Sequence, residues 1–231
     1  MPSVLPGEHI SAQHVNLKLG PGLQQLSSVK EQSFIISTRA GELQSSANRS
    51  KWWIESNSRR VVCASSPGVG HWRCCGRSGE GWRVDIGAAH VASLDGLAFE
   101  GATKRNRPNL KVGSLLYARV SLAHKDMEPE LECFDAQTRK AEGFGELKGG
   151  FMVECSLRMC RLLLDGGFYL LPLIGARFPL QVAVGLNGRV WINAEEAKHI
   201  IAVSRCIEAV DPDGGGMDEA GVKKFLNTLD V

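Results

Sequence analysis

The sequence has little net charge, few aromatic residues and no long hydrophobic run. Its 231 residues carry a formal net charge of +2 at pH 7, and aromatic residues account for 6% of them. A surplus this small does not identify a nucleic-acid partner, so evidence for one must come from local clusters of basic residues. No segment has the roughly 18 consecutive apolar residues of a membrane-spanning helix, and we therefore expect no membrane partner.

Signs of secretion and of a metal centre are also missing. Residues 1–8 lack the charged region and apolar core of a signal peptide, so we expect no secretion. The seven cysteines have no regular spacing, which favours a reducing compartment over a disulfide framework. Potential zinc ligands gather in one segment, but without the paired CxxC spacing of a zinc site: Cys63, His71, Cys74 and Cys75. We expect no metal and no cofactor.

Turn residues and changes of periodicity divide the chain into three predicted modules. Residues 1–58 alternate short strand-like runs with Pro and Gly turns, which predicts a small β module. Residues 59–135 hold several short strands without a long helical pattern, which is typical of a five-stranded OB barrel. Residues 136–231 mix strand and helix periods and end in an amphipathic tail, which predicts an α+β domain. The predicted fold class is therefore mixed β and α+β.

The last module contains the clearest local signal. Asn187-Gly188 favours a type I′ hairpin turn because both residues tolerate positive φ, and strand-like residues flank it on either side. Apolar residues then recur at helical spacing: Ala197, Ile200, Ile201 and Ile207. We predict a strand, a tight turn formed by Gly185, Asn187 and Gly188, a second strand and a helix. Cys155 and Cys160, at a predicted strand–helix junction, are expected to be buried as small apolar residues.

This pattern resembles the end of the KH-type domain in the cap proteins of the eukaryotic RNA exosome, of the ribosomal RNA-processing protein 40 type. Other blocks resemble the S1 domain of the same family, an OB fold, or its N-terminal module. The S1-like blocks are residues 99–109, 112–119 and 125–130, and the N-terminal ones are Leu5-Pro-Gly7 and Leu19-Gly-Pro-Gly22. The resemblance implies an N-terminal β module, an S1 barrel and a KH-like domain.

The resemblance also implies a function. Such a protein is a non-catalytic, RNA-binding cap subunit that supports 3′→5′ RNA processing and degradation, including rRNA processing. It stabilises a ring of phosphorolytic-nuclease-like subunits, contacts other cap proteins and guides RNA to the nuclease. The implied location is the nucleus and nucleolus, and also the cytoplasm. The Gly185–Gly188 turn is implied to be structural and packed against the S1 domain, since the nucleotide-clamping GXXG loop of KH domains joins two helices rather than two strands.

The candidate RNA-binding residues are Lys104, Arg105 and Arg107. They place three cations within four residues, in a predicted loop of the barrel. Such groups neutralise phosphates and release counterions, and OB folds contact oligonucleotides through their loops. A solvated loop, or one that docks on another protein, is the alternative. The five tryptophans are expected in cores rather than on base-stacking faces.

An acidic strip leaves a second functional class open. Asp126, Glu128, Glu130 and Glu132 alternate, which places them on one face of a strand. Paired carboxylates could hold Mg²⁺ for phosphodiester cleavage, so a metal-dependent ribonuclease is one alternative. We prefer a solvated or interface face, because such chemistry gathers acidic residues from several elements and this strip is a single segment. A free-standing RNA-binding protein is a third possibility.

Residues 61–78 depart from the expected pattern. The resembling proteins have their first S1 strand there, whereas this segment alternates poorly and holds three cysteines. Possible codons for Gly70–Gly76, read one base later, encode Ala-Thr-Gly-Val-Val-Val-Gly, which is a strand-like sequence. We hypothesise a local reading-frame error and expect the first barrel strand to be distorted or absent.

Overall fold

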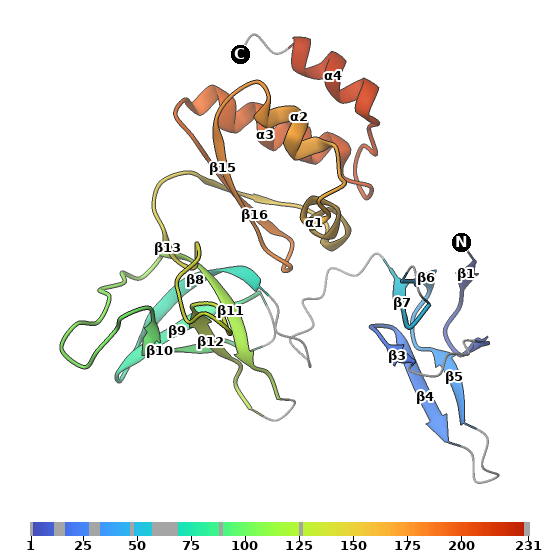
Figure 1. Cartoon of the computed structure of the whole chain (residues 1–231), viewed down its shortest axis with the longest axis horizontal. Helices are drawn as coiled ribbons and strands as arrows, with labels where there is room; N and C mark the ends of the chain where they lie inside the picture. The colour runs from blue at the N-terminus through green and yellow to red at the C-terminus, as the bar shows by residue number, and fades with distance from the viewer. Residues whose placement is uncertain are drawn as a thin grey trace. The chain divides into compact units, whose positions relative to one another are not determined.

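The structure is a computed structural model, and it forms two compact units, residues 1–58 and 59–231 (Figure 1). The residues that it describes are 2–11, 17–27, 33–46, 49–56, 69–87, 90–124 and 127–228. No helix among them is long and apolar enough to cross a membrane.

The first unit contains two small β-sheets. Val4, Leu43 and Ile54 form its buried core, each from a different strand. The four-stranded sheet has the order β1-β6-β7-β3, and the three-stranded sheet the order β2-β5-β4. The strands are β1 (Ser3–Val4), β2 (His9–Ile10), β3 (Lys18–Leu19), β4 (Leu23–Ser27), β5 (Ser33–Ser37), β6 (Gly41–Ser45) and β7 (Lys51–Glu55). The first unit is thus the predicted type of β module.

The second unit begins with a closed barrel. The strands are β8 (Val69–Ser78), β9 (Gly81–Asp85), β10 (Ala92–Phe99), β11 (Leu115–Leu122), β12 (Glu130–Cys133) and β13 (Gly145–Leu147). Their order is β12-β10-β9-β8-β11-β13, and β12 also pairs with β11, which closes a ring of five strands (Figure 1). Alternate residues of β10 point inward, so that Ala92, Leu94 and Ala98 are buried. This is the predicted OB-type barrel.

The first barrel strand was expected to be distorted or absent, and the structure shows it present but distorted. β8 pairs with β11 on one side and β9 on the other, and its pairing with β9 shifts register between Cys74 and Gly76. Trp72 and Cys74 are buried in the barrel, and Trp72 Nε1 donates a hydrogen bond to the carbonyl oxygen of Ala118 at 3.1 Å. The strand therefore contains a β-bulge: Cys74 pairs with Val84 and Gly76 pairs with Arg83, which leaves Cys75 as one extra residue on β8. Residues 61–68 lie outside the described residues.

The remainder of the second unit is the predicted α+β domain. Its sheet has the order β14-β16-β15, with all neighbours antiparallel. Helices α1 and α3 both bury apolar residues against one core with this sheet. The elements are β14 (Phe151–Glu154), α1 (Leu157–Leu164), α2 (Leu170–Gly175), β15 (Leu180–Val184), β16 (Arg189–Ala194), α3 (Ala197–Val210) and α4 (Glu219–Thr228).

Helix α3 confirms the predicted helical period, but not all of the residues predicted to be buried on one face of the helix are buried. Val203, Ile207 and Val210 are buried at spacings of four and three residues. Ile201, which the sequence pattern placed on this face, is 52% exposed. Successive residues of a helix are rotated by 100°, so Ile201 turns away when Val203 and Ile207 face the sheet.

Candidate nucleic-acid interface

The predicted basic residues lie in the loop between β10 and β11. Thr103 and Asn106 exchange two backbone hydrogen bonds, of 3.0 and 3.1 Å, and thereby close a tight turn. Lys104 and Arg105 occupy the tip of this turn and are exposed. Their charges are therefore available to a partner at the surface of the barrel.

Arg107 differs from its two neighbours because it points back to the barrel. Its Nη2 atom forms an ion pair with Glu80 Oε2 at 3.0 Å, and its Nη1 atom donates to the Glu80 carbonyl oxygen at 3.4 Å. The side chain of Arg107 is 23% exposed. Glu80 belongs to the β8–β9 turn. Arg107 therefore holds the basic loop against that turn and does not extend into solvent. The three predicted residues thus divide into an exposed pair and an anchor.

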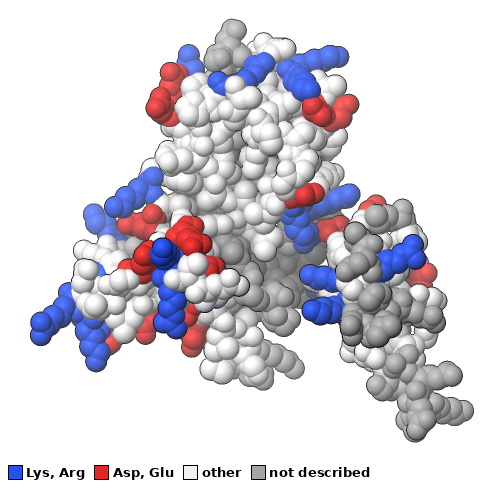
Figure 2. All heavy atoms as spheres, viewed as in Figure 1, with Lys and Arg blue, Asp and Glu red and all other residues white. Residues whose placement is uncertain are grey.

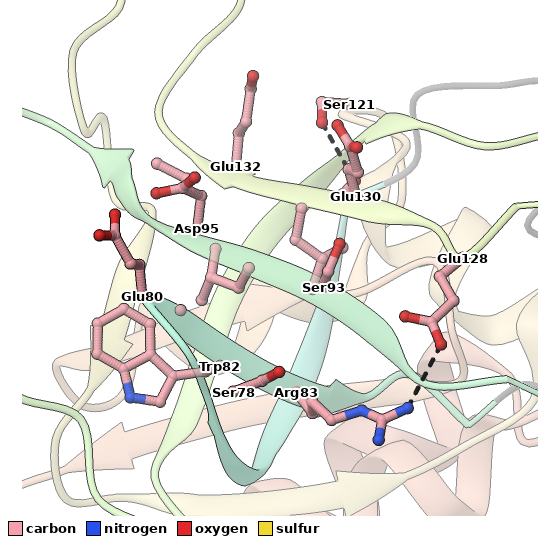
Figure 3. A pocket seen from close by; sticks show the side chains of 14 residues that line it. Ser78, Glu80, Trp82, Arg83, Ser93, Asp95, Ser121, Glu128, Glu130 and Glu132 are labelled. Atoms are coloured by element: carbon pink, nitrogen blue, oxygen red, sulfur yellow. Dashed lines mark hydrogen bonds and ion pairs between the residues drawn. The ribbon is translucent and has the colours of Figure 1, made fainter.

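A cavity of about 570 Å³ opens on the outer face of the barrel beside this anchor (Figure 3). Strands β9, β10 and β12 line most of it. Five carboxylates and one guanidinium are among its lining groups: Glu80, Asp95, Glu128, Glu130, Glu132 and Arg83. In other OB folds the second and third strands and the adjacent loops bind oligonucleotides. Here the corresponding strands contribute one charge of each sign, Arg83 from β9 and Asp95 from β10. The other four carboxylates come from β12 and the adjacent loops, so the cavity as a whole is acidic and repels phosphates.

The predicted acidic strip forms one side of this cavity. Glu128 Oε1 is 3.3 Å from Arg83 Nη2, and Glu132 forms an ion pair with Arg119. Glu130 and Glu132 lie on the same face of β12, as the alternation predicted, whereas Glu128 precedes the strand. Asp126 lies outside the described residues. Within the described part of the chain, no group of three or more His, Cys, Asp or Glu side chains is arranged to hold a metal ion. Glu128 and Glu132 are thus paired with arginines rather than with one another.

Basic and acidic side chains are also mixed elsewhere. Figure 2 shows Lys and Arg interspersed with Asp and Glu over the face in view, without one continuous basic surface. This distribution agrees with the small net charge. On this face, an RNA contact would depend on local groups rather than on a broad basic surface.

The Gly185–Gly188 turn joins β15 to β16, as predicted, but its backbone differs from the prediction. Gly185 N donates to the carbonyl oxygen of Arg189 at 2.9 Å, which leaves three residues in the loop. Gly188 has a φ of 77°, whereas Asn187 is not among the residues of positive φ. The prediction of positive φ at both residues is wrong, because a three-residue hairpin loop needs only its last residue in the left-handed region.

The turn packs on its own domain. Cys155 N donates to the carbonyl oxygen of Gly188 at 2.9 Å, which holds the turn against the junction of β14 and α1. A Cβ atom at Gly188 would lie 2.9 Å from the carbonyl oxygen of Cys155. Asn187 is 8% exposed, so its side chain is unavailable to a nucleotide, whereas Leu186 is 41% exposed. The contacts with the barrel come from residues that flank the turn.

Two such contacts join the barrel to the α+β domain. Tyr117 Oη donates to the carbonyl oxygen of Val184 at 3.2 Å. Arg189 Nη2 lies 3.7 Å from Asp85 Oδ2 at the end of β9. The implied packing of the turn against the S1 domain is thus carried by the residues before and after it.

The aromatic and sulfur-containing candidates are structural. Trp72, Trp82 and Trp191 are between 3% and 6% exposed, which places them in cores rather than on a base-stacking face. Trp52 and Trp53 are only partly buried, so the expectation of a core position does not hold fully for these two. Cys74 is buried, and burial raises the pKa of its thiol. Cys63 and the side chain of His71 lie outside the described residues.

A β module, an OB-type barrel and an α+β domain with a GxNG hairpin define the class of S1–KH proteins. Three family models match these modules in order along the chain. They are described as the exosome complex exonuclease Rrp40 N-terminal domain (residues 17–60), the exosome complex component RRP40 S1 domain (73–145) and a KH domain (150–198).

Relatives of known name agree with these matches. The chain is 45% identical over 207 residues to exosome complex component rrp40 of Schizosaccharomyces pombe, covering 87% of this chain and 85% of that protein. It is 32% identical over 207 residues to exosome complex component RRP40 of Homo sapiens, covering 87% and 73%. The chain belongs to the exosome complex component RRP40 family.

A solved structure shares the fold. It is a crystal structure of a protein assigned as an exosome complex RNA-binding protein, with a TM-score of 0.59 and 20% sequence identity. The match covers 74% of this chain and 95% of that one.

Proposed function

We propose that this chain is a non-catalytic, RNA-binding cap subunit of the RNA exosome. It supports 3′→5′ RNA processing and degradation, including rRNA processing, by stabilising the ring of phosphorolytic-nuclease-like subunits and guiding RNA to the nuclease. Its partners are RNA, the ring proteins and the other cap proteins. The observation that carries this function is 45% identity with a named exosome component along most of both chains.

The arrangement of the acidic groups supports a role without catalysis. Glu128 and Glu132 each form an ion pair with an arginine, so the two do not act together as a pair of carboxylates for a divalent cation. The ribonuclease alternative would need such a pair, together with a further ligand from another element. The contribution of the chain to RNA turnover is therefore the positioning of RNA.

For RNA contact, the exposed tip of the basic loop is the best-suited group. Lys104 and Arg105 act on phosphates without reading sequence, because two flexible cations on a turn offer no base-reading geometry. Arg107 serves as the anchor of the loop through Glu80. The five carboxylates on β10, β12 and the adjacent loops favour a path for the RNA that avoids this cavity.

We also propose that the protein resides in the nucleus and nucleolus, and in the cytoplasm. This follows from the proposed rRNA processing, which takes place where ribosomes are assembled. Microscopy of the tagged chain tests it directly, and exclusion from the nucleolus would contradict it.

Affinity purification from the native cells tests the function. The tagged chain should co-purify with a set of ring and cap subunits in stable proportion, and the purified complex should degrade RNA from the 3′ end. Recovery of the chain alone with RNA would instead support a free-standing RNA-binding protein. Metal-dependent RNA decay by the isolated chain, lost in Glu128→Ala, would support the ribonuclease.

A further inference from the structure

Two cysteines meet beneath the GxNG hairpin. The Sγ atoms of Cys155 and Cys160 are 3.4 Å apart, within hydrogen-bond distance, and either thiol can be the donor. Cys155 follows the last residue of β14, and Cys160 lies in the first half of α1. Cys160 is fully buried, whereas Cys155 is only partly buried and presents some surface to solvent.

We propose that Cys155 and Cys160 form a reversible dithiol–disulfide pair that is oxidised by hydroperoxides and reduced by thiols. This inference is independent of the proposed function. A disulfide needs sulfur atoms about 2.05 Å apart, and the two sulfurs have to approach by little more than an ångström to reach that separation. Small rotations about the two Cα–Cβ bonds provide such an approach without unfolding the helix.

The backbone around the pair is held in place. Ser156, between the strand and the helix, donates from its N and Oγ atoms to the carboxylate of Asp211 at 2.7 and 2.6 Å. Its Oγ also accepts from Met159 N at 3.0 Å and so caps the helix. Because these bonds fix the end of β14 against the first turn of α1, the two sulfurs stay close in the reduced protein.

The contact between the sulfurs also affects their acidity. The hydrogen bond from Cys155 lowers the pKa of the Cys160 thiol, and the backbone N–H of Gly188 lowers it further, while the same sulfur contact raises the pKa of Cys155. After the first proton is lost, the remaining proton lies between two sulfurs 3.4 Å apart. A thiolate is the reactive form of cysteine, so the pair is more easily oxidised than an isolated buried thiol.

The chemistry balances with one hydroperoxide per disulfide. The proton held between the two sulfurs moves to Cys160, and the thiolate of Cys155, the partly exposed member, attacks the peroxide oxygen. The O–O bond breaks, Cys155 becomes a sulfenic acid, and the leaving hydroxide or alkoxide takes up the proton that the pair lost first. Cys160 then attacks the sulfenic sulfur, which forms the S–S bond and releases water. Two thiols lose two protons and two electrons in total, and the peroxide takes them up as water, or as water and an alcohol.

The hairpin is the part of the domain that responds to this change. Gly188 contacts both halves of the pair, since its carbonyl oxygen accepts from Cys155 N at 2.9 Å and its N–H interacts with the sulfur of Cys160. When the sulfurs approach one another, Cys160 no longer offers a thiolate to this N–H. Oxidation therefore changes the bonds that hold the GxNG turn.

Peptide mapping of the full-length protein tests the proposal. The folded chain is treated with hydrogen peroxide, and the peroxide is then removed. The protein is denatured, blocked with an alkylating agent and digested with trypsin, which cleaves after Arg158 and so separates the two cysteines. We expect the peptide that contains Cys155 to be joined to the one that contains Cys160, and the joined species to disappear on treatment with dithiothreitol. Cys75→Ser is the background of choice, because Cys75 is exposed and would otherwise form bonds between molecules.

Internal controls and variants sharpen the result. Cys133 and Cys206 are buried, with thiol pKa values raised by burial to about 12 and about 11, and should remain alkylatable throughout. In Cys160→Ser, Cys155 should accumulate as a sulfenic or sulfinic acid because its resolving partner is gone. The proposal is overturned if Cys155 and Cys160 both stay alkylatable at peroxide levels that oxidise Cys75 in the unmodified protein, or if Cys155 is over-oxidised without being joined to Cys160.

Discussion

The hydroxyl of Tyr117 donates a hydrogen bond of 3.2 Å to the carbonyl oxygen of Val184, and so links barrel strand β11 to strand β15 of the KH-like domain. The ring of Tyr117 also stacks on Phe144, with ring centroids 5.2 Å apart. The two domains of the second unit are therefore joined by a side chain whose polar end and aromatic face both have partners.

Replacement of Tyr117 by Phe removes this hydrogen bond and keeps the stacked ring. We expect a loss of about 0.5–1.5 kcal/mol in the free energy of unfolding, the net value of one such bond. Denaturant unfolding measures it. Tyr117→Ala should cost more, since it also removes the contact with Phe144, and equal stability of Tyr117→Phe and the unmodified protein would show that the bond contributes nothing.

The same tyrosine gives a pH dependence. Burial raises the pKa of the Tyr117 phenol above its usual value near 10, so the folded state holds this proton more tightly than the unfolded state. The contribution of the neutral phenol to the free energy of unfolding is fully present below about pH 10. It is lost as the pH rises through the pKa of Tyr117 in the folded state. Tyr117→Phe should lack this component, and the difference between the two proteins in unfolding experiments from pH 8 to 11 measures it.

Replacement of Gly188 by Val should destabilise the protein. The φ of 77° is unfavourable for a β-branched residue, and the new Cβ would lie 2.9 Å from the carbonyl oxygen of Cys155. We expect a cost of at least about 1–2 kcal/mol and poorer incorporation into the exosome ring, with no selective loss of RNA affinity.

Gly166→Ala is the matched control for this substitution. Gly166 has no positive φ, and a Cβ atom there meets open space. This variant should melt and assemble like the unmodified protein. The structural role of the hairpin would be refuted by a Gly188→Val protein of normal stability and assembly that had lost only RNA binding.

The basic loop should act through its tip. Each phosphate contact on a single strand contributes about 0.7 to the slope of log affinity against log salt, so Lys104→Ala/Arg105→Ala should flatten that slope by about 1.4. Adding Arg107→Ala should change the slope little further, because Arg107 is paired with Glu80. Binding of unrelated RNA sequences by the assembled complex at several salt concentrations is the measurement.

The Glu80→Gln variant controls for the anchor. It removes the ion pair of Arg107 without touching the tip, and should leave the salt slope close to that of the unmodified complex. If the double variant with intact assembly shows unchanged affinity and slope, the loop does not contact RNA.

Residues 61–72 lie between the first two family matches and belong to neither. The reading-frame hypothesis predicts that the transcript encodes a strand of small and β-branched residues in place of Gly70–Cys75. Sequencing of the transcript decides this, and an in-frame read of the printed residues would dismiss the hypothesis. With Trp72 present, residue 70 has to be glycine, because a Cβ atom at residue 70 would lie 2.4 Å from the ring of Trp72.

Several features follow from the sequence alone, because they depend on neighbours along the chain. The GxNG hairpin and the helical period that begins at Ala197 each predicted an element that the structure contains. Strand and helix periods arise from local backbone geometry, so a single segment is enough to recognise them. The order of these elements, together with the blocks that resemble the exosome cap proteins, also predicted the family.

Other features depend on residues far apart in sequence, and only the tertiary structure decided them. Arg107 became an anchor through Glu80, 27 residues away, although the sequence presented it as an equal of Lys104 and Arg105. The acidic cavity combines carboxylates from a turn, β10 and β12, of which the sequence indicated only the last group. Asn187 and Ile201 took conformations or orientations that their local pattern did not predict, because loop closure and packing against a distant sheet outweigh local preference. Charge pairing and burial act through space, and a linear pattern does not contain the distances on which they depend.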